Sequence, residues 1–447
     1  MNLRFNDWMN VRILKLAVPS IASSITVPLV GMVDTAIAGR LGDAACIGGV
    51  AIGAMLFDML YWNLGFLRVG TAGLTAQAYG RRDFREAMRV LIQSLATALL
   101  CAVVVLLIQV PYVWGIFQFV TCSAEVEQYA RAYFAIRVFA APATLSLFAL
   151  RGWFIGMQNT VFPMIIEFVV NGVNIATSLW LVFYAGMGVK GIALGTVLAQ
   201  YMGLCCGLFL WAVYYGKFRK YIDWAASIKA KEIKRFFVLN GNLFLRTVCM
   251  LFIYCGFTIF AARYGDTLLA VSTIMMKLML LYSYFIDGFA YSGEALAGRF
   301  IGAKEPQSLR LATRLLLIWA VAIGVVSTAV YLFGSEALLH LMTSNQEVVA
   351  AAAPFLPWLL IMPTISCIAF IWDGIFIGAT AAKALRNVML LSAMGFIIGY
   401  YATESFWGVH ALWVGYTLHL FIRSLFMTLF ARKEVFERAE GEIPKLL

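Results

Sequence analysis

The sequence predicts an all-α polytopic membrane protein with about twelve transmembrane helices, built as two related six-helix halves. Composition, helix-length apolar segments and an internal repeat lead to this fold class. Of the 447 residues, 62% are hydrophobic and only 13% are charged, whereas a soluble domain carries about 25% charged residues. A soluble chain with this deficit could not cover its surface, so a bilayer is the simplest solvent that fits.

Twelve apolar segments follow one another along the chain. A spanning helix needs about 20 apolar residues, so a chain of this length has room for about a dozen. Several segments exceed 25 residues, and we therefore expect tilted or bent helices. The predicted spans are residues 11–39, 46–79, 88–112, 124–150, 160–184, 189–215, 236–263, 267–300, 311–333, 347–378, 385–402 and 406–431.

Basic residues are concentrated on one side of the predicted membrane. The two termini and alternate loops contain 24 of the 34 Lys and Arg residues. The loops on the other side contain only Arg40, Arg131, Lys190 and Arg263. The positive-inside rule then places both termini in the cytoplasm, as does the even number of spans. The net charge of +11 thus indicates membrane topology, and we expect no nucleic-acid partner.

An internal repeat divides the chain at its long polar linker, residues 216–235. We predict an N-terminal six-helix lobe at 1–215 and a C-terminal six-helix lobe at 236–447. The offset of about 222 residues contains six spans, so the halves have the same orientation and are parallel repeats, an architecture typical of transporters. The matches are residues 39–43 with 262–266, Gly80 with Gly302, 154–156 with 376–378, and 188–189 with 408–409.

Motifs in four predicted helices are specific when they are taken together. They are residues 29–36 (LVGMVDTA), 73–80 (GLTAQAYG), 287–291 (DGFAY) and 373–380 (DGIFIGAT). Through these motifs the chain resembles the multidrug and toxic compound extrusion (MATE) family, in particular its DNA-damage-inducible F-like branch. The resemblance covers essentially the whole chain.

The resemblance implies two bundles around a central cleft in the plasma (inner) membrane of a bacterium. It also implies a secondary antiporter that exports cationic or amphipathic organic compounds while protons or sodium ions enter. We expect a monomer that binds small-molecule substrates and holds neither a cofactor nor a metal.

The resemblance also assigns candidate coupling residues. The first-helix aspartate of the family corresponds to Asp34, and the fifth-helix motif asparagine corresponds to Asn174. The family often has an aspartate four residues later, where this chain has Ser178. Related branches place a sodium-binding glutamate in the seventh helix, where the polar residue here is Arg246. The sequence therefore favours protons over sodium as the coupling ion.

Asp34 is the strongest candidate for a coupling residue on physical grounds alone. An ionisable residue at the centre of a membrane helix costs about 2.5–3.5 kcal/mol and indicates function. Asp34 follows Pro28 in a helix that also contains Pro19, and proline frees a backbone carbonyl and bends a spanning helix. A carboxylate near a moving bend changes its solvation, as proton coupling requires. The alternative is a purely structural hydrogen bond.

A polar stripe follows one face of the predicted fifth helix, within an arc of ~60°. Because the rest of this helix is apolar, the stripe must face the bundle interior. We hypothesise that Glu167 replaces the missing carboxylate of the family pattern; alternatively it pairs with Arg151 or Arg137. The candidate coupling residues on this helix and the next are Glu167, Asn171, Asn174, Ser178, Thr196 and Gln200.

Charged and aromatic residues also follow one face of the predicted eighth helix. The stripe extends from Lys277 to Glu294, about 25 Å along the axis, and resembles the wall of a pathway. The alternative is a static ion-pair network that stabilises the lobe. The candidates, with companions on two other helices, are Lys277, Tyr284, Asp287, Tyr291, Glu294, Arg246 and Asp373.

Other functional classes lack their motifs. The sequence has no P-loop, H-E-x-x-H or G-x-S-x-G pattern, so we expect neither direct ATP coupling nor an enzyme. The rival interpretations are a flippase for a lipid-linked precursor, which is commonly a longer chain, and a static-pore channel. Duplicated halves with bent helices favour alternating access over an open pore.

Overall fold

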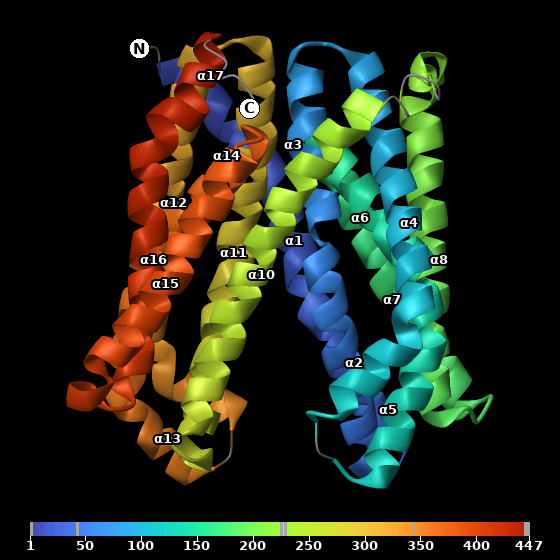
Figure 1. Cartoon of the computed structure of the whole chain (residues 1–447), viewed down its shortest axis with the longest axis vertical. Helices are drawn as coiled ribbons and strands as arrows, with labels where there is room; N and C mark the ends of the chain where they lie inside the picture. The colour runs from blue at the N-terminus through green and yellow to red at the C-terminus, as the bar shows by residue number, and fades with distance from the viewer. Residues whose placement is uncertain are drawn as a thin grey trace. The chain divides into compact units, whose positions relative to one another are not determined.

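Helices account for nearly the whole of the computed structural model, which describes residues 3–41, 44–120, 122–223, 227, 230–343 and 345–441 (Figure 1). The described residues contain no strand. Among these described residues, twelve helical segments are long and apolar enough to cross a membrane. The predicted fold class is therefore confirmed. Residues 42–43 of the repeat and residues 224–226 and 228–229 of the predicted linker lie outside the described residues.

The described part of the N-terminal half forms six spans from eight α-helices. Two predicted spans are each built from two helices: Gly65 separates α2 from α3, and the 3₁₀ turn η1 joins α5 to α6. The elements are α1 (Leu3–Gly39), α2 (Ala44–Leu64), α3 (Phe66–Gly80), α4 (Phe84–Phe117), α5 (Ala124–Arg137), η1 (Val138–Ala140), α6 (Ala141–Gly156), α7 (Val161–Phe183) and α8 (Gly188–Tyr215).

The C-terminal half repeats this order, with a continuous α11 at the place of α2 and α3. Several helices extend beyond the predicted spans by a turn or more. The elements are η2 (Gly216–Tyr221), α10 (Ala230–Ala262), α11 (Asp266–Ala303), α12 (Pro306–Met342), α13 (Gln346–Ala352), η3 (Ala353–Phe355), α14 (Leu356–Gly378), α15 (Ala382–Trp407), α16 (His410–Ala431), η4 (Arg432–Phe436) and α17 (Glu437–Glu440).

Helix packing is the same in both halves. In the N-terminal half α7 packs on α8 and α4 packs on α6. In the C-terminal half α15 packs on α16 and α12 packs on α14. These pairs occupy corresponding places in the order of spans, as the internal repeat predicts.

Glycines at equivalent places let two helix backbones meet closely in each half. A Cβ added to any of them would lie 2.0–2.8 Å from a carbonyl oxygen of the facing helix, so only glycine fits. Both the glycines and their partners are related by an offset of 222 residues, the offset of the sequence repeat. The approaches are Gly152 to Arg68, Gly156 to Ala72, Gly374 to Ala290, and Gly378 to Glu294.

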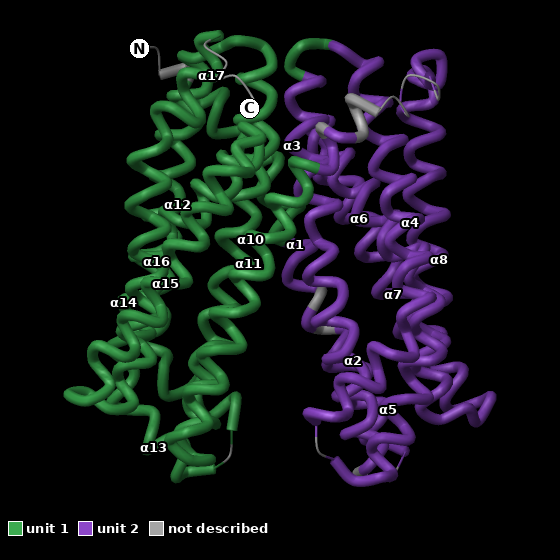
Figure 2. Tube along the Cα trace, in the orientation of Figure 1, with its two compact units in different colours: residues 1–21, 80–82, 238–447 green, residues 22–79, 83–237 purple. Residues whose placement is uncertain are grey.

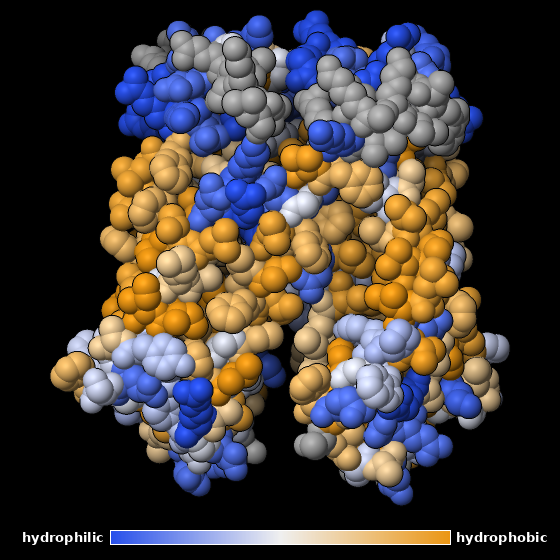
Figure 3. All heavy atoms as spheres, in the orientation of Figure 1, coloured by the Kyte–Doolittle hydropathy of each residue, from blue (hydrophilic) through white to orange (hydrophobic). Residues whose placement is uncertain are grey.

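Contacts divide the chain into two compact units (Figure 2). Unit 1 comprises Met1–Ile21, Gly80–Arg82 and Val238–Leu447, and unit 2 comprises Ala22–Tyr79 and Asp83–Phe237. One boundary therefore falls inside α1, two residues after Pro19. Within each unit an apolar belt lies between hydrophilic ends (Figure 3), which is the pattern of a membrane-spanning bundle.

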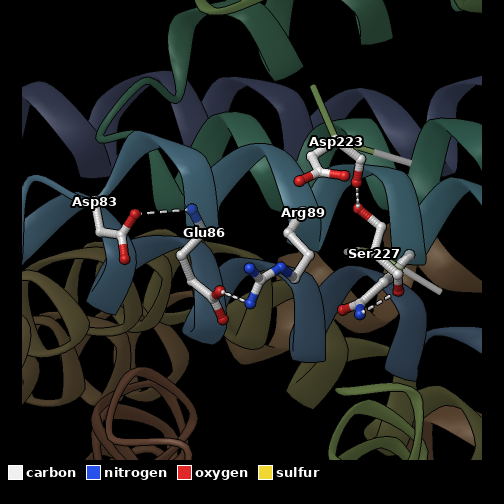
Figure 4. A network of polar contacts seen from close by, with 6 residues as sticks. Asp83, Glu86, Arg89, Asp223 and Ser227 are labelled. Carbon is white, nitrogen blue, oxygen red and sulfur yellow. Dashed lines mark hydrogen bonds and ion pairs between the residues drawn. The ribbon is translucent and has the colours of Figure 1, made fainter. Parts of the chain in front are cut away.

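Polar contacts attach the segment after η2 to α4 in unit 2 (Figure 4). The Asp83 side chain caps α4 by accepting a hydrogen bond from the backbone N–H of Glu86, and Glu86 forms an ion pair with Arg89 at 2.8 Å. One turn further along α4, Gln93 donates a hydrogen bond to the backbone oxygen of Ser227 at 2.9 Å. This part of the predicted linker is therefore held against the bundle.

Candidate functional site

Asp34 lies near the C-terminal end of α1, six residues after Pro28. Its side chain is buried, with 7% of the residue exposed. Its Oδ1 atom is buried and has no hydrogen-bond partner among the described residues. A buried carboxylate oxygen without a partner is costly, so Asp34 is not explained by a purely structural hydrogen bond at this oxygen.

The cation that acts electrostatically on Asp34 is Arg137, the last residue of α5. Arg137 interacts electrostatically with both Asp34 and Asp58. It donates a hydrogen bond to the hydroxyl of Tyr133 at 2.8 Å, and its guanidinium lies 4.8 Å from the ring centroid of Phe57. The site in unit 2 is therefore a carboxylate and a guanidinium from two helices, in an aromatic surrounding that suits a cation.

The polar stripe of α7 lies partly in the core of unit 2. Asn174 is 1% exposed and donates a hydrogen bond to Thr196 Oγ1 on α8 at 3.0 Å. Ser178 is fully buried one turn later. Asn171 is half-buried and donates to the backbone oxygen of Thr26 in α1 at 3.4 Å, two residues before Pro28. The stripe therefore connects α8 to the part of α1 that precedes Pro28.

Two members of the predicted coupling set lie apart from these contacts. Glu167 forms an ion pair with Arg151 of α6, with a distance of 2.5 Å between Arg151 Nη1 and Glu167 Oε2. This pair is one of the alternatives that the sequence left open. Gln200 is half-buried on α8, one turn after Thr196.

A second buried charge cluster lies in unit 1. Asp373 of α14 accepts hydrogen bonds at Oδ2 from two arginines, Arg246 of α10 at 2.5 Å and Arg423 of α16. The three residues are 7%, 9% and 2% exposed, respectively. One carboxylate thus joins three helices and partly neutralises two cations.

Aromatic residues surround this cluster. The guanidinium of Arg423 lies 5.6 Å from the ring centroid of Phe370. Tyr254 of α10 interacts electrostatically with Arg423, Asp373 and Asp287. Asp287 of α11 therefore lies within electrostatic range of the cluster.

The stripe of α11 changes from exposed to buried along the helix. Lys277 is exposed; Tyr284, Asp287 and Tyr291 are half-buried; and Glu294 is fully buried. The structure brings Arg246 and Asp373 into direct contact, whereas the two ends of the stripe lie in different environments.

Sequence reasoning missed Arg137 as the neighbour of Asp34 and did not consider Arg423. Both are cations within candidate membrane spans, so the rule that singled out Asp34 applies to them as well, although Arg137 ends a helix that also contains Arg131. Their partners lie on helices far away in sequence, and no local pattern connects them. Among the described residues, no group of three or more His, Cys, Asp or Glu side chains could hold a metal ion.

Twelve candidate spans, duplicated six-helix halves and a buried charge cluster in each half define the class of polytopic membrane transporters. The MatE family model matches residues 19–180 and 243–401. The chain therefore belongs to the MatE family, which confirms the predicted family and a transporter rather than an enzyme.

Curated relatives agree with this assignment. The chain is 35% identical over 424 residues to DNA damage-inducible protein F of Escherichia coli (strain K12), covering 92% of this chain and 89% of that protein. It is 23% identical over 437 residues to multidrug resistance protein NorM of Aliivibrio fischeri, covering 94% and 93%. The first of these relatives belongs to the branch that the sequence motifs indicated.

Solved structures share the fold. A crystal structure of MATE in the bent conformation has a TM-score of 0.88 at 16% identity and covers 97% of each chain. An outward-facing multidrug resistance MATE family transporter has a TM-score of 0.82 at 18% identity and covers 96% of each chain. These similarities confirm the architecture of about twelve helices in two bundles.

Proposed function

We propose that this chain is a secondary antiporter that exports amphipathic or cationic organic compounds in exchange for protons, by alternating access. In this proposal it works as a monomer in the bacterial inner membrane, with both termini in the cytoplasm. The N-terminal half couples proton movement to transport. The observation that carries the proposal is Asp34, a buried carboxylate with an unpartnered oxygen, which Arg137 influences electrostatically and which lies in a helix with two prolines.

The surroundings of Asp34 support proton exchange at this residue. Burial disfavours the charged form of a carboxyl group and a neighbouring cation favours it. A movement of α1 relative to α5 would therefore change whether Asp34 holds a proton. Pro19 and Pro28 weaken the backbone ladder of α1 at two places, and the boundary between the compact units falls between them, after Ile21.

The polar stripe would transmit this movement to α7. Asn171 contacts the backbone of α1 at Thr26, and Asn174 contacts α8 through Thr196. We infer that Asn171, Asn174, Thr196 and Ser178 position α1 and form the polar surroundings of the coupling site. Glu167 stabilises the lobe through Arg151, and Gln200 remains a candidate one turn after Thr196.

The proposal assigns a different role to unit 1. Asp373 is held by two arginines, so a change in its charge would leave two buried cations without their shared partner. We propose that Arg246, Asp373 and Arg423 hold the lobe together. The half-buried residues of α11, Tyr284, Asp287 and Tyr291, are then the candidates for contact with substrate, with Lys277 and Glu294 at the two ends of the stripe.

Transport by Asp34→Asn tests the coupling site. In proteoliposomes loaded with ethidium, a cationic amphipathic dye, we expect this variant to lose dye movement driven by a pH gradient while its unfolding temperature stays close to wild type. Asp7→Asn is the matched control, since Asp7 is an exposed aspartate on the same helix. Full transport by Asp34→Asn would contradict the role of Asp34 as the proton-coupling residue.

The coupling ion is tested separately on the wild-type chain. We expect an imposed pH gradient to drive ethidium against its concentration gradient in sodium-free buffer. An imposed sodium gradient at equal pH should have little effect. Strict dependence on sodium would refute proton coupling and leave the transporter assignment intact.

A further inference from the structure

A groove in unit 1 lies outside both charge clusters. Its volume is about 680 Å³, within the size range of ligand sites, roughly 300–1,000 Å³. The first turns of α12, the last turns of α16 and the π-helical segment η4 line it, together with Trp372 of α14. We call this site the α12–α16 groove.

The α12 wall changes from basic to apolar with depth. Arg310 and Arg314 are exposed on the first turns of the helix, and Leu317, Ile318 and Val321 follow on the same face. From Arg314 to Val321 the wall extends about 10 Å along the helix axis. Because α12 is a candidate span that begins at Pro306, the arginines lie where a headgroup layer would meet the protein.

The mouth of the groove is basic overall. Arg432, the first residue of η4, is the third arginine that lines it. Arg310 pairs with Glu440 at 2.7 Å, and Arg432 lies 3.7 Å from Glu437. No acidic partner contacts Arg314 among the described residues.

The Thr313 side chain adds an independent polar feature between the two arginines of α12. Thr313 lines the groove and is only 4% exposed. Its Oγ1 atom is buried and has no hydrogen-bond partner among the described residues. An unpartnered buried hydroxyl is costly, and rotation of this side chain toward the groove would let the hydroxyl donate to a ligand oxygen.

We propose that the α12–α16 groove binds an acidic phospholipid. The phosphodiester lies between Arg310, Arg314 and Arg432 and accepts a hydrogen bond from Thr313, and the start of an acyl chain lies along Ile318 and Val321. Arginine suits a phosphate because its planar donors match two oxygens at once. Basic pockets between membrane helices on the cytoplasmic side commonly bind anionic headgroups.

Lipid binding by the purified full chain tests this proposal. In detergent, native mass spectrometry compares dioleoyl phosphatidylglycerol with dioleoyl phosphatidylcholine, which has the same acyl chains and no net charge. We expect the wild-type chain to retain phosphatidylglycerol preferentially. The double variant Arg310→Gln/Arg314→Gln should weaken this binding by about tenfold or more, as expected for the loss of two cations at an anionic headgroup.

Two further variants separate a built site from general surface attraction. Arg81→Gln/Arg85→Gln removes two exposed arginines that do not line the groove, so phosphatidylglycerol binding should change by less than about twofold. Val321→Phe fills the apolar part and keeps every arginine, and it should lower phosphatidylglycerol binding although the charge is unchanged. Val321 is exposed, so the larger side chain leaves the helix packing intact.

Several results would overturn the proposal. They are equal retention of the two lipids, an equal loss in the Arg81/Arg85 control pair, or wild-type binding by Val321→Phe. Competition by millimolar inorganic phosphate would instead identify a phosphate-ion site, and the lipid assignment would be wrong. Preferential binding that is lost in both groove variants and kept in the control pair supports it.

Discussion

Replacing Asp373 by asparagine should destabilise unit 1 strongly. The Asp373 carboxylate accepts hydrogen bonds from Arg246 and Arg423, which are 9% and 2% exposed. Asparagine has nearly the same shape and no charge. The change therefore leaves two buried guanidinium groups facing a neutral amide, with their mutual repulsion uncompensated.

The magnitude follows from the burial of the cluster. Removing one partner from a buried ion pair costs about 3–5 kcal/mol. Unfolding entropy is about 2.1 cal/mol/K per residue, so for the roughly 210 residues of this unit's main segment each kcal/mol corresponds to ~2.3 °C. We therefore expect the unfolding temperature to fall by about 7–11 °C.

A triple variant tests the physical reasoning behind this number. Asp373→Asn/Arg246→Gln/Arg423→Gln removes all three charges and leaves no buried cation unpaired. Replacing a whole buried ion network by well-packed hydrophobic residues is often close to neutral in stability. The three amides of this variant are polar, but they leave no buried charge uncompensated. We therefore expect the triple variant to be more stable than Asp373→Asn alone, which is the opposite of additive losses.

Tryptophan fluorescence during heating in detergent measures these effects, since the chain has 12 tryptophans. Glu336→Gln is the matched control because Glu336 is an exposed carboxylate in the same unit, and it should change stability by less than about 0.5 kcal/mol. Unfolding of Asp373→Asn at the temperature of this control would contradict the expected cost of two unpaired buried arginines. A triple variant that is less stable than Asp373→Asn would contradict it as well.

Two further predictions concern the helix contacts. Glu167→Gln should lower the unfolding temperature by several degrees because it leaves Arg151 unpaired, while dye transport by the folded protein stays near wild type; loss of transport at unchanged stability would make Glu167 a coupling residue instead. Gly374→Ala should prevent close packing of α14 on α11, since its Cβ would lie 2.0 Å from the backbone oxygen of Ala290. Size-exclusion profiles of the detergent-purified variants should show a loss of folded protein, whereas Gly172→Ala, with nothing within 4 Å of the added Cβ, should be harmless.

The sequence was sufficient to predict the twelve spans and the duplication. Apolar segments of spanning length are a local signal, and the repeat is visible because glycines such as Gly156 and Gly378 stay in register. The structure explains the register physically, since each of these glycines lets two backbones meet. Helix breaks were harder to predict. Gly65 interrupts the second span in one half only, and a single glycine in an apolar run does not reveal whether a helix continues.

The charged sites were only partly predictable. Asp34 and Asp373 stand out because carboxylates are rare in membrane helices. What each carboxylate contacts depends on helix packing, and the sequence does not contain that information in any local form. Arg137 is about one hundred residues from Asp34, and Arg423 is fifty residues from Asp373 on another helix. The same limit left Glu167 with two open interpretations.

The difference between Asp34 and Asp373 indicates that the two halves of this duplicated transporter have different roles. A proton-coupling carboxylate must exchange its proton as its surroundings change, so it cannot be fixed by several permanent partners. Asp34 meets this condition, because among the described residues no ion pair holds it, and Arg137 acts on it only electrostatically. Asp373 does not meet it, because two buried arginines hold one oxygen. We therefore infer that the repeated scaffold serves proton exchange in the N-terminal half and rigidity in the C-terminal half.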